Sequence, residues 1–298
     1  MESGRGRTQD RNGIRLTNRF MPYVKRSTGP DLHYSIDDFT DPWKTAPYLI
    51  LQHGNGRSGA FWYSWVPYLS RFYKVVRPDV RGLGQSSADF DLERDFTVEA
   101  CVEDALALID HLGADAVHFC GESMGGMIGM GLAATHPARV RTLTLVSTPI
   151  SINEKGKVTF ADKHSKEEQD RGVDAWLEAS NRSMRFPADA DPGLVTWYNA
   201  EFKKSRREVQ AAMGTLANRA NVAGFLPRIK APVLGLYPSA GPLTTPEQER
   251  ILMDNIGDLT MVHLPAAYHK IQLMFPATCA LQLLHFIAQH DGVPCREN

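Results

Sequence analysis

From residue 47 onward, short apolar runs alternate with longer amphipathic stretches. The apolar runs are five to seven residues long, and each ends in glycine, proline or polar residues, at 47–53, 73–79, 116–120 and 140–146. Runs of this length are typical of buried strands. The stretches between them have helical length, and 97–112 carries its apolar residues on one helical face. This alternation predicts an α/β fold with a mostly parallel, doubly wound sheet.

The alternation stops between residues 149 and 224. This stretch contains charged helical segments at 165–184 and 194–217 and no clear strand pattern. The strand signal returns at 233–237 and 259–264, and a last helix is expected at 276–289. We therefore expect a sheet domain that is interrupted by a helical insertion.

The expected domain boundaries follow from this change of pattern. They are a flexible N-terminal arm (1–30), a core in two parts (31–148 and 225–298) and a helical cap (149–224). The arm is rich in arginine, but no apolar segment follows it as in a secretory signal.

Composition narrows the class of protein. The 298 residues are 43% hydrophobic and 22% charged, enough for one large domain. A net charge of -1 gives no reason to expect nucleic acid or a membrane surface as a partner. No apolar run approaches the roughly 18 residues of a transmembrane helix. The four cysteines form no metal or disulfide pattern, which favours a cytoplasmic location. The sequence is compatible with a homo-oligomer.

The most informative motif is Gly121-Glu122-Ser123-Met124-Gly125, which lies between a predicted strand and a predicted helix. This context is the one in which the G-x-S-x-G pattern forms a sharp turn with an exposed serine nucleophile. Ser123 is therefore the candidate nucleophile. The backbone N–H of Met124, at the start of the helix, is a candidate donor to an oxyanion.

A serine nucleophile needs a base, and His269 is the best-placed histidine. It follows the last predicted strand and precedes the last helix, at the sheet edge where open α/β sheets bind ligands. His53 is a second candidate, although a His-Gly pair after a buried strand more often shapes the oxyanion loop. Within that loop, the N–H of Asn55 is the candidate for the second oxyanion donor.

These motifs resemble those of the α/β-hydrolase superfamily over residues 47–290. The resemblance rests on the His53–Gly56 loop, the Asp79–Ser86 turn, the serine turn and His269. The residues around Ser123, together with His136–Val140, look most like the enol-lactonase and small-ester hydrolase branch. The resemblance implies a cofactor-independent hydrolase with a helical cap and a small-molecule ester or lactone as substrate.

One position departs from the family pattern. Such enzymes usually carry an aspartate after the strand that ends near Tyr237, and Gly241 occupies the expected position here. An acid that orients the histidine can contribute several orders of magnitude in rate. Ser239 is a neutral replacement, and the displaced carboxylates to consider are Asp254, Asp258, Glu247 and Glu154. A protein with little hydrolase activity is the remaining explanation.

Glu122 has two interpretations, as a contact within the site or as a structural partner at the sheet edge. Aromatic residues near the oxyanion loop, Trp62 among them, are expected in the core, with one of them as a pocket residue. The cap aromatics Trp176, Trp197 and Tyr198 are further pocket candidates. The leading hypothesis is a serine hydrolase of a small ester or lactone. The alternatives are a C–C bond hydrolase or lyase in the same pocket, and a ligand-binding sensor on a hydrolase scaffold.

Overall fold

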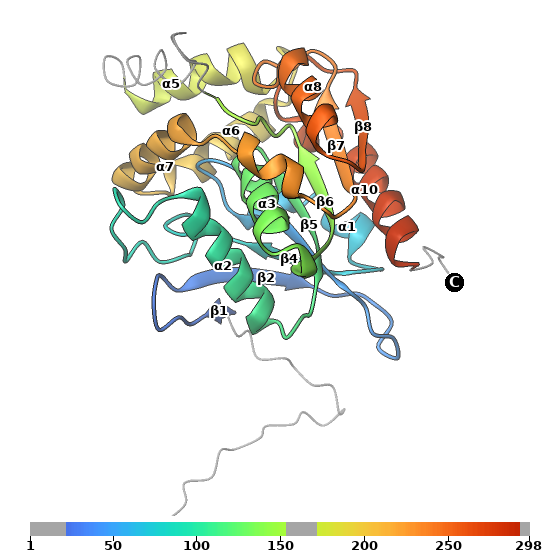
Figure 1. Cartoon of the computed structure of the whole chain (residues 1–298). Coiled ribbons are helices and arrows are strands. Elements are labelled where there is room, and N and C mark those ends of the chain that lie inside the picture. Colours follow the sequence, from blue (N-terminus) through green and yellow to red (C-terminus); the bar gives the residue numbers. More distant parts are fainter. Residues whose placement is uncertain (1–21, 153–171, 293–298) are drawn as a thin grey trace, which may run out of the picture.

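A computed structural model describes residues 22–152 and 172–292, and its centre is one twisted sheet (Figure 1). Within these ranges eight strands pair in the order β1-β2-β4-β3-β5-β6-β7-β8. The strands are β1 (Tyr23–Val24), β2 (Leu32–Asp37), β3 (Tyr48–Gln52), β4 (Lys74–Pro78), β5 (Val117–Glu122), β6 (Val140–Val146), β7 (Val233–Pro238) and β8 (Leu259–Leu264). From β4 to β8 all neighbours are parallel, whereas β2 pairs antiparallel with both β1 and β4.

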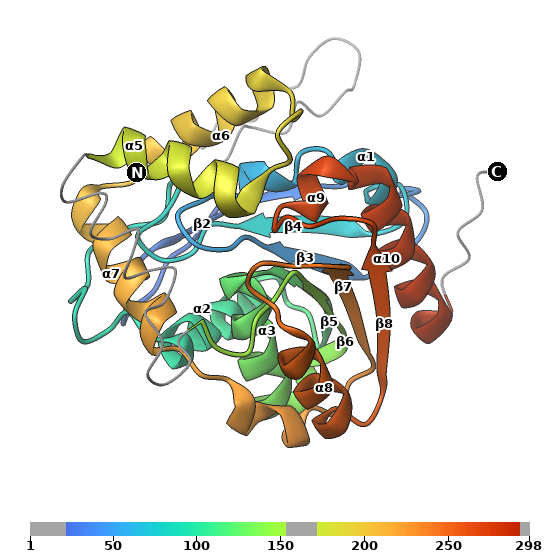
Figure 2. The same cartoon turned by 90° about the horizontal axis from the view of Figure 1, so that it is seen from above.

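Helices cover both faces of the sheet, as Figure 2 shows, with α2, α3 and α8 on one side and α1, α9 and α10 on the other. The described helices are α1 (Val66–Leu69), α2 (Val98–His111), α3 (Met124–Thr135), α5 (Val173–Ser180), α6 (Pro192–Lys203), α7 (Arg207–Arg219), α8 (Pro246–Asn255), α9 (Ile271–Met274) and α10 (Pro276–Asp291). Each face has its own apolar core, and the central strands β3, β5, β6 and β7 between them are almost entirely buried. The predicted doubly wound α/β fold is confirmed. No helix in the described ranges has the length and apolar character needed to cross a bilayer.

Three local expectations need correction. Residues 23–24 belong to the sheet as β1, so the expected arm ends before residue 30; residues 1–21 lie outside the described ranges. The stretch 60–70, which has helical length in the sequence, is no continuous helix: it consists of a 3₁₀ turn (Gly59–Trp62) and the short α1, with a proline in the first turn of α1. The expected helix at 194–217 is two helices, because the backbone of Arg206 is extended (ψ 143°) between α6 and α7. The Gln210 amide donates to the carbonyls of Phe202 and Ser205 at this break.

The insertion between β6 and β7 is mostly helical in its described part. Figure 1 shows α5, α6 and α7 together over one end of the sheet. A π-helical segment, Asn181–Arg185, follows α5 directly. Its backbone accepts two hydrogen bonds from the loop after β8, from His269 N to Met184 O (2.7 Å) and from Lys270 N to Arg185 O (3.1 Å). The insertion therefore holds the loop that carries His269.

Candidate active site

Ser123 occupies a strained turn between β5 and α3. Its φ of 53° is rare for a residue other than glycine. The turn requires small neighbours, since a Cβ on Gly121 would lie 2.3 Å from the Gly125 backbone, and one on Gly125 would lie 2.3 Å from Gln52 O. The Ser123 N–H donates to Val146 O at 3.0 Å. Close packing of three segments thus fixes the serine at the end of the strand.

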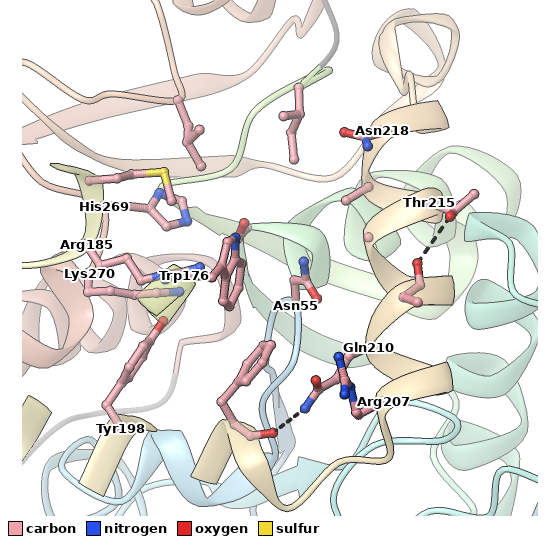
Figure 3. A pocket seen from close by; sticks show the side chains of 18 of the residues that line it. Asn55, Trp176, Arg185, Tyr198, Arg207, Gln210, Thr215, Asn218, His269 and Lys270 are labelled. Atoms are coloured by element: carbon pink, nitrogen blue, oxygen red, sulfur yellow. Dashed lines mark hydrogen bonds between the residues drawn. The ribbon is translucent and has the colours of Figure 1, made fainter. Parts of the chain in front are cut away.

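Ser123, His269 and Asn55 line the same cavity, which has a volume of about 620 Å³. Figure 3 shows His269, Arg185, Lys270 and Tyr198 on one side of it, opposite side chains of α7. The cavity is large enough for a small organic substrate. The Ser123 hydroxyl and the His269 ring make no hydrogen bond to one another in the described part of the chain. Such contacts commonly tighten only when substrate is bound.

The ring of His269 faces Glu122, with Nε2 3.2 Å from Oε1 of that carboxylate. Burial lowers the pKa of His269 below its ordinary value, the Lys270 ammonium lowers it further, and Glu122 acts in the opposite direction. The imidazole is therefore neutral at neutral pH. With Nε2–H donated to Glu122, the other ring nitrogen, Nδ1, keeps its lone pair and is available as a base.

Glu122 is the last residue of β5, and only 2% of its surface is exposed. The Lys270 ammonium donates to Oε1 at 2.6 Å. Burial alone would raise the pKa of Glu122, but Lys270 and His269 hold it well below the usual range. The carboxylate is thus ionised and shared between a histidine and a lysine.

The other proposed orienting groups lie elsewhere. The Ser239 hydroxyl donates to Ala266 O at 3.3 Å and does not contact His269, which corrects the expectation of a neutral partner there. Gly241 leaves its position without a side chain. The exposed carboxylates of the α8 region are Asp254, Asp258 and Glu247. Glu154 lies outside the described residues. Among the described carboxylates, Glu122 is the one that reaches the His269 ring.

The oxyanion loop after β3 lies directly against the serine turn. A Cβ on Gly54 would lie 2.5 Å from Glu122 Oε2 and 3.0 Å from the Ser123 Cβ. This contact brings the next residue, Asn55, into the cavity wall. Met124 is the first residue of α3, where backbone N–H groups have no acceptor within the helix. Both predicted oxyanion donors therefore flank Ser123.

His53 is held on both ring nitrogens by backbone groups. Val80 N–H donates to Nε2 at 3.0 Å, and Nδ1 lies 2.8 Å from Gly54 O. Its ring therefore supports the oxyanion loop. Trp62 is 1% exposed and packs edge-on against Trp65 in the core, so it does not line the cavity that contains Ser123.

The insertion supplies the aromatic and cationic residues of the cavity. Trp176 and Tyr198 line it, as expected for cap aromatics, whereas Trp197 does not. Sequence reasoning missed Arg185 and Lys270. Lys270 directly follows the candidate base, and this adjacency was the available signal. Nothing in the local sequence marks Arg185, because its place depends on how the insertion packs over the sheet.

Comparison with known proteins shows to which family the chain belongs. The family model for the alpha/beta hydrolase fold matches residues 47–273. The chain belongs to this family. Among curated relatives, "Putative carbamate hydrolase RutD" of Stutzerimonas stutzeri (strain A1501) is 26% identical over 273 residues, covering 88% of this chain and 98% of that protein. The 3-oxoadipate enol-lactonase 2 of Acinetobacter baylyi is 26% identical over 224 residues, covering 74% of this chain and 82% of that protein.

The structural comparison agrees with this assignment. The crystal structure of the enol-lactonase from Burkholderia xenovorans LB400 matches with a TM-score of 0.79 at 28% identity, covering 90% of this chain and all of that one (100%). The predictions of an α/β hydrolase and of a resemblance to enol-lactonases are confirmed.

Proposed function

We propose that this α/β hydrolase cleaves a small ester or lactone through an acyl-enzyme formed on Ser123. The observation that carries the proposal is the position of Ser123. It lies on a strained strand-to-helix turn, in one cavity with a neutral His269 whose ring is oriented by a buried carboxylate. This combination supplies a nucleophile, a base and an orienting acid.

In the first half-reaction, Ser123 Oγ attacks the substrate carbonyl while His269 Nδ1 takes the hydroxyl proton. The carbonyl oxygen becomes an oxyanion that accepts hydrogen bonds from the N–H groups of Met124 and Asn55. The tetrahedral intermediate then collapses, the bond to the leaving oxygen breaks, and His269 gives that oxygen its proton. In a lactone the leaving oxygen remains attached to the acyl group.

In the second half-reaction, water attacks the acyl-enzyme and His269 again takes and returns a proton. Glu122 accepts the Nε2–H throughout and stabilises the imidazolium that forms in each transition state. Glu122 thus takes the role that an aspartate near Gly241 has in the usual family pattern.

Labelling with a fluorophosphonate probe tests the nucleophile. We expect a single adduct at Ser123, measured by intact mass and located by peptide mapping, and no adduct in Ser123→Ala. Ser239→Ala is the matched control and is expected to label at the wild-type rate, since its hydroxyl bonds to Ala266. A folded wild-type protein that does not label contradicts the covalent mechanism and favours a ligand-binding role.

Product analysis then separates ester or lactone cleavage from C–C bond cleavage. The proposal predicts an acid and an alcohol, or a hydroxy acid from a lactone. Products broken at carbon would instead support the C–C hydrolase or lyase alternative.

A further inference from the structure

An uncommon group of positive side chains surrounds Tyr198 at the wall of the cavity. The Arg57 guanidinium lies 3.7 Å from the centre of the Tyr198 ring, the Lys270 ammonium 5.8 Å and the Arg185 guanidinium 6.0 Å. All three side chains belong to buried residues. Because a buried charge is costly unless it is paired, each of them calls for a negative partner.

Glu122 balances only Lys270. Neither guanidinium lies within 4.0 Å of a carboxylate in the described ranges. Arg185 Nη1 donates to two neutral oxygens, Ser180 Oγ and Asn181 Oδ1. Burial lowers the pKa of Arg185 to about 10, which leaves the guanidinium protonated at neutral pH. Arg185 is therefore a positive group without a charged partner among the described residues.

Tyr198 adds a free donor at the same place. Its hydroxyl is buried and has no hydrogen-bond partner among the described residues. A buried hydroxyl without a partner is uncommon and indicates a missing acceptor. The acceptor that suits a phenol, a guanidinium and an ammonium together is an anionic oxygen.

Three of these groups face the reaction site directly. Arg185, Lys270 and Tyr198 line the cavity that also contains Ser123 and His269 (Figure 3). Arg57 does not line this cavity and adds its charge from behind the Tyr198 ring. With Lys270 paired with Glu122, Arg185 is the buried cation of the cavity wall that no carboxylate balances among the described residues, and it suits a negative group of the substrate.

We propose that Arg185, Lys270 and Tyr198 form a subsite for a carboxylate of the substrate, separate from the carbonyl that Ser123 attacks. The inference rests on the proposed hydrolase function and makes it specific: the substrate is an ester or lactone that carries a carboxylate. The planar guanidinium of Arg185 suits a carboxylate through paired N–H donors.

Two matched substrates test this proposal, mono-4-nitrophenyl adipate and its methyl-capped form, 4-nitrophenyl methyl adipate. The wild type is expected to show at least tenfold higher kcat/KM on the free acid. Charge-assisted hydrogen bonds make that preference sensitive to Arg185, so Arg185→Gln should lower kcat/KM on the free acid about tenfold to a hundredfold. The loss of kcat/KM on the capped ester should be at least threefold smaller than the loss on the free acid, because the capped ester offers Arg185 no negative charge.

Arg182→Gln is the matched control, because Arg182 lies in the same segment but is exposed and pairs with Glu178. It should retain the wild-type preference. Tyr198→Phe removes one hydroxyl and should lower the preference about threefold to tenfold, which tests the subsite even if Arg185→Gln does not fold. Equal rates on both esters in the wild type, or equal losses on both in Arg185→Gln, would overturn the proposal.

A binding measurement separates this proposal from the hydrolase mechanism. If neither ester is cleaved in a Ser123-dependent way, adipate is titrated into the Ser123→Ala protein by calorimetry, with adipamide as the neutral match. Adipate binding that Arg185→Gln weakens at least tenfold, and that Arg182→Gln leaves unchanged, supports the subsite without hydrolysis. Absence of adipate binding, or equal binding of adipate and adipamide, overturns the subsite.

Discussion

Glu122 contacts two buried residues: it forms an ion pair with Lys270 and lies beside the ring of His269. Replacing Glu122 by glutamine tests both contacts at once. Glu122 and Lys270 are joined at 2.6 Å, and their side chains are 3% and 5% exposed. Glu122→Gln keeps the shape but leaves the Lys270 ammonium buried without a carboxylate. Removing one partner of a buried ion pair costs about 3–5 kcal/mol, so we expect a loss of that size in the free energy of unfolding at pH 7.

The double variant Glu122→Gln/Lys270→Met removes both charges. Replacing a whole buried pair by neutral groups is often close to neutral, so the double variant should recover most of the lost stability. Its activity should not recover, since His269 still lacks the carboxylate that orients it. We expect kcat/KM to stay about 10²- to 10⁴-fold below wild type in both Glu122 variants.

Urea unfolding followed by tryptophan fluorescence measures the stabilities, with a common m-value as the test of comparable transitions. The labelling rate of Ser123 is measured in the same three proteins, the wild type, Glu122→Gln and the double variant. A double variant no more stable than Glu122→Gln would refute the ion-pair reasoning. Recovery of labelling in the double variant would refute the orienting role of Glu122.

Three further predictions use the same geometry. Because the pKa of His269 is lowered, the kcat/KM of the wild type should fall at acid pH only below about pH 6.5. Lys270→Met should move this fall to higher pH and Glu122→Gln should move it to lower pH. Profiles of kcat/KM against pH measure both shifts. Gly125→Ala should lower the melting temperature and abolish labelling, because its Cβ would lie 2.3 Å from Gln52 O, whereas Gly257→Ala, with nothing within 4 Å, should do neither. His118 is buried between Thr142 and Asp291, with 2.9 Å to each, so Asp291→Ala should cost about 1–3 kcal/mol in urea unfolding and leave kcat unchanged.

Local patterns along the chain predicted the strands β5, β6, β7 and β8 and the helices α2, α3 and α10 closely. These elements have strong signals, since apolar runs stop at glycines or prolines and the helices have one apolar face. The serine turn was predictable for a steric reason, as Gly121 and Gly125 leave room that no other residue would leave. The edge strand β1 was missed because its two residues are too few to show an alternating pattern of apolar and polar positions.

The partners within the cavity were decided by the tertiary structure. Glu122 and Lys270 are 148 residues apart, and only the strand order brings the end of β5 to the loop after β8. Arg185 reaches the same place because the insertion folds back and accepts the backbone hydrogen bonds of that loop. The sequence by itself determined the class of fold and indicated the candidate nucleophile and the candidate base, since these depend on local sterics and periodicity. Which carboxylate lies beside the candidate base, and which cations line the cavity, depends on long-range packing that no local pattern encodes.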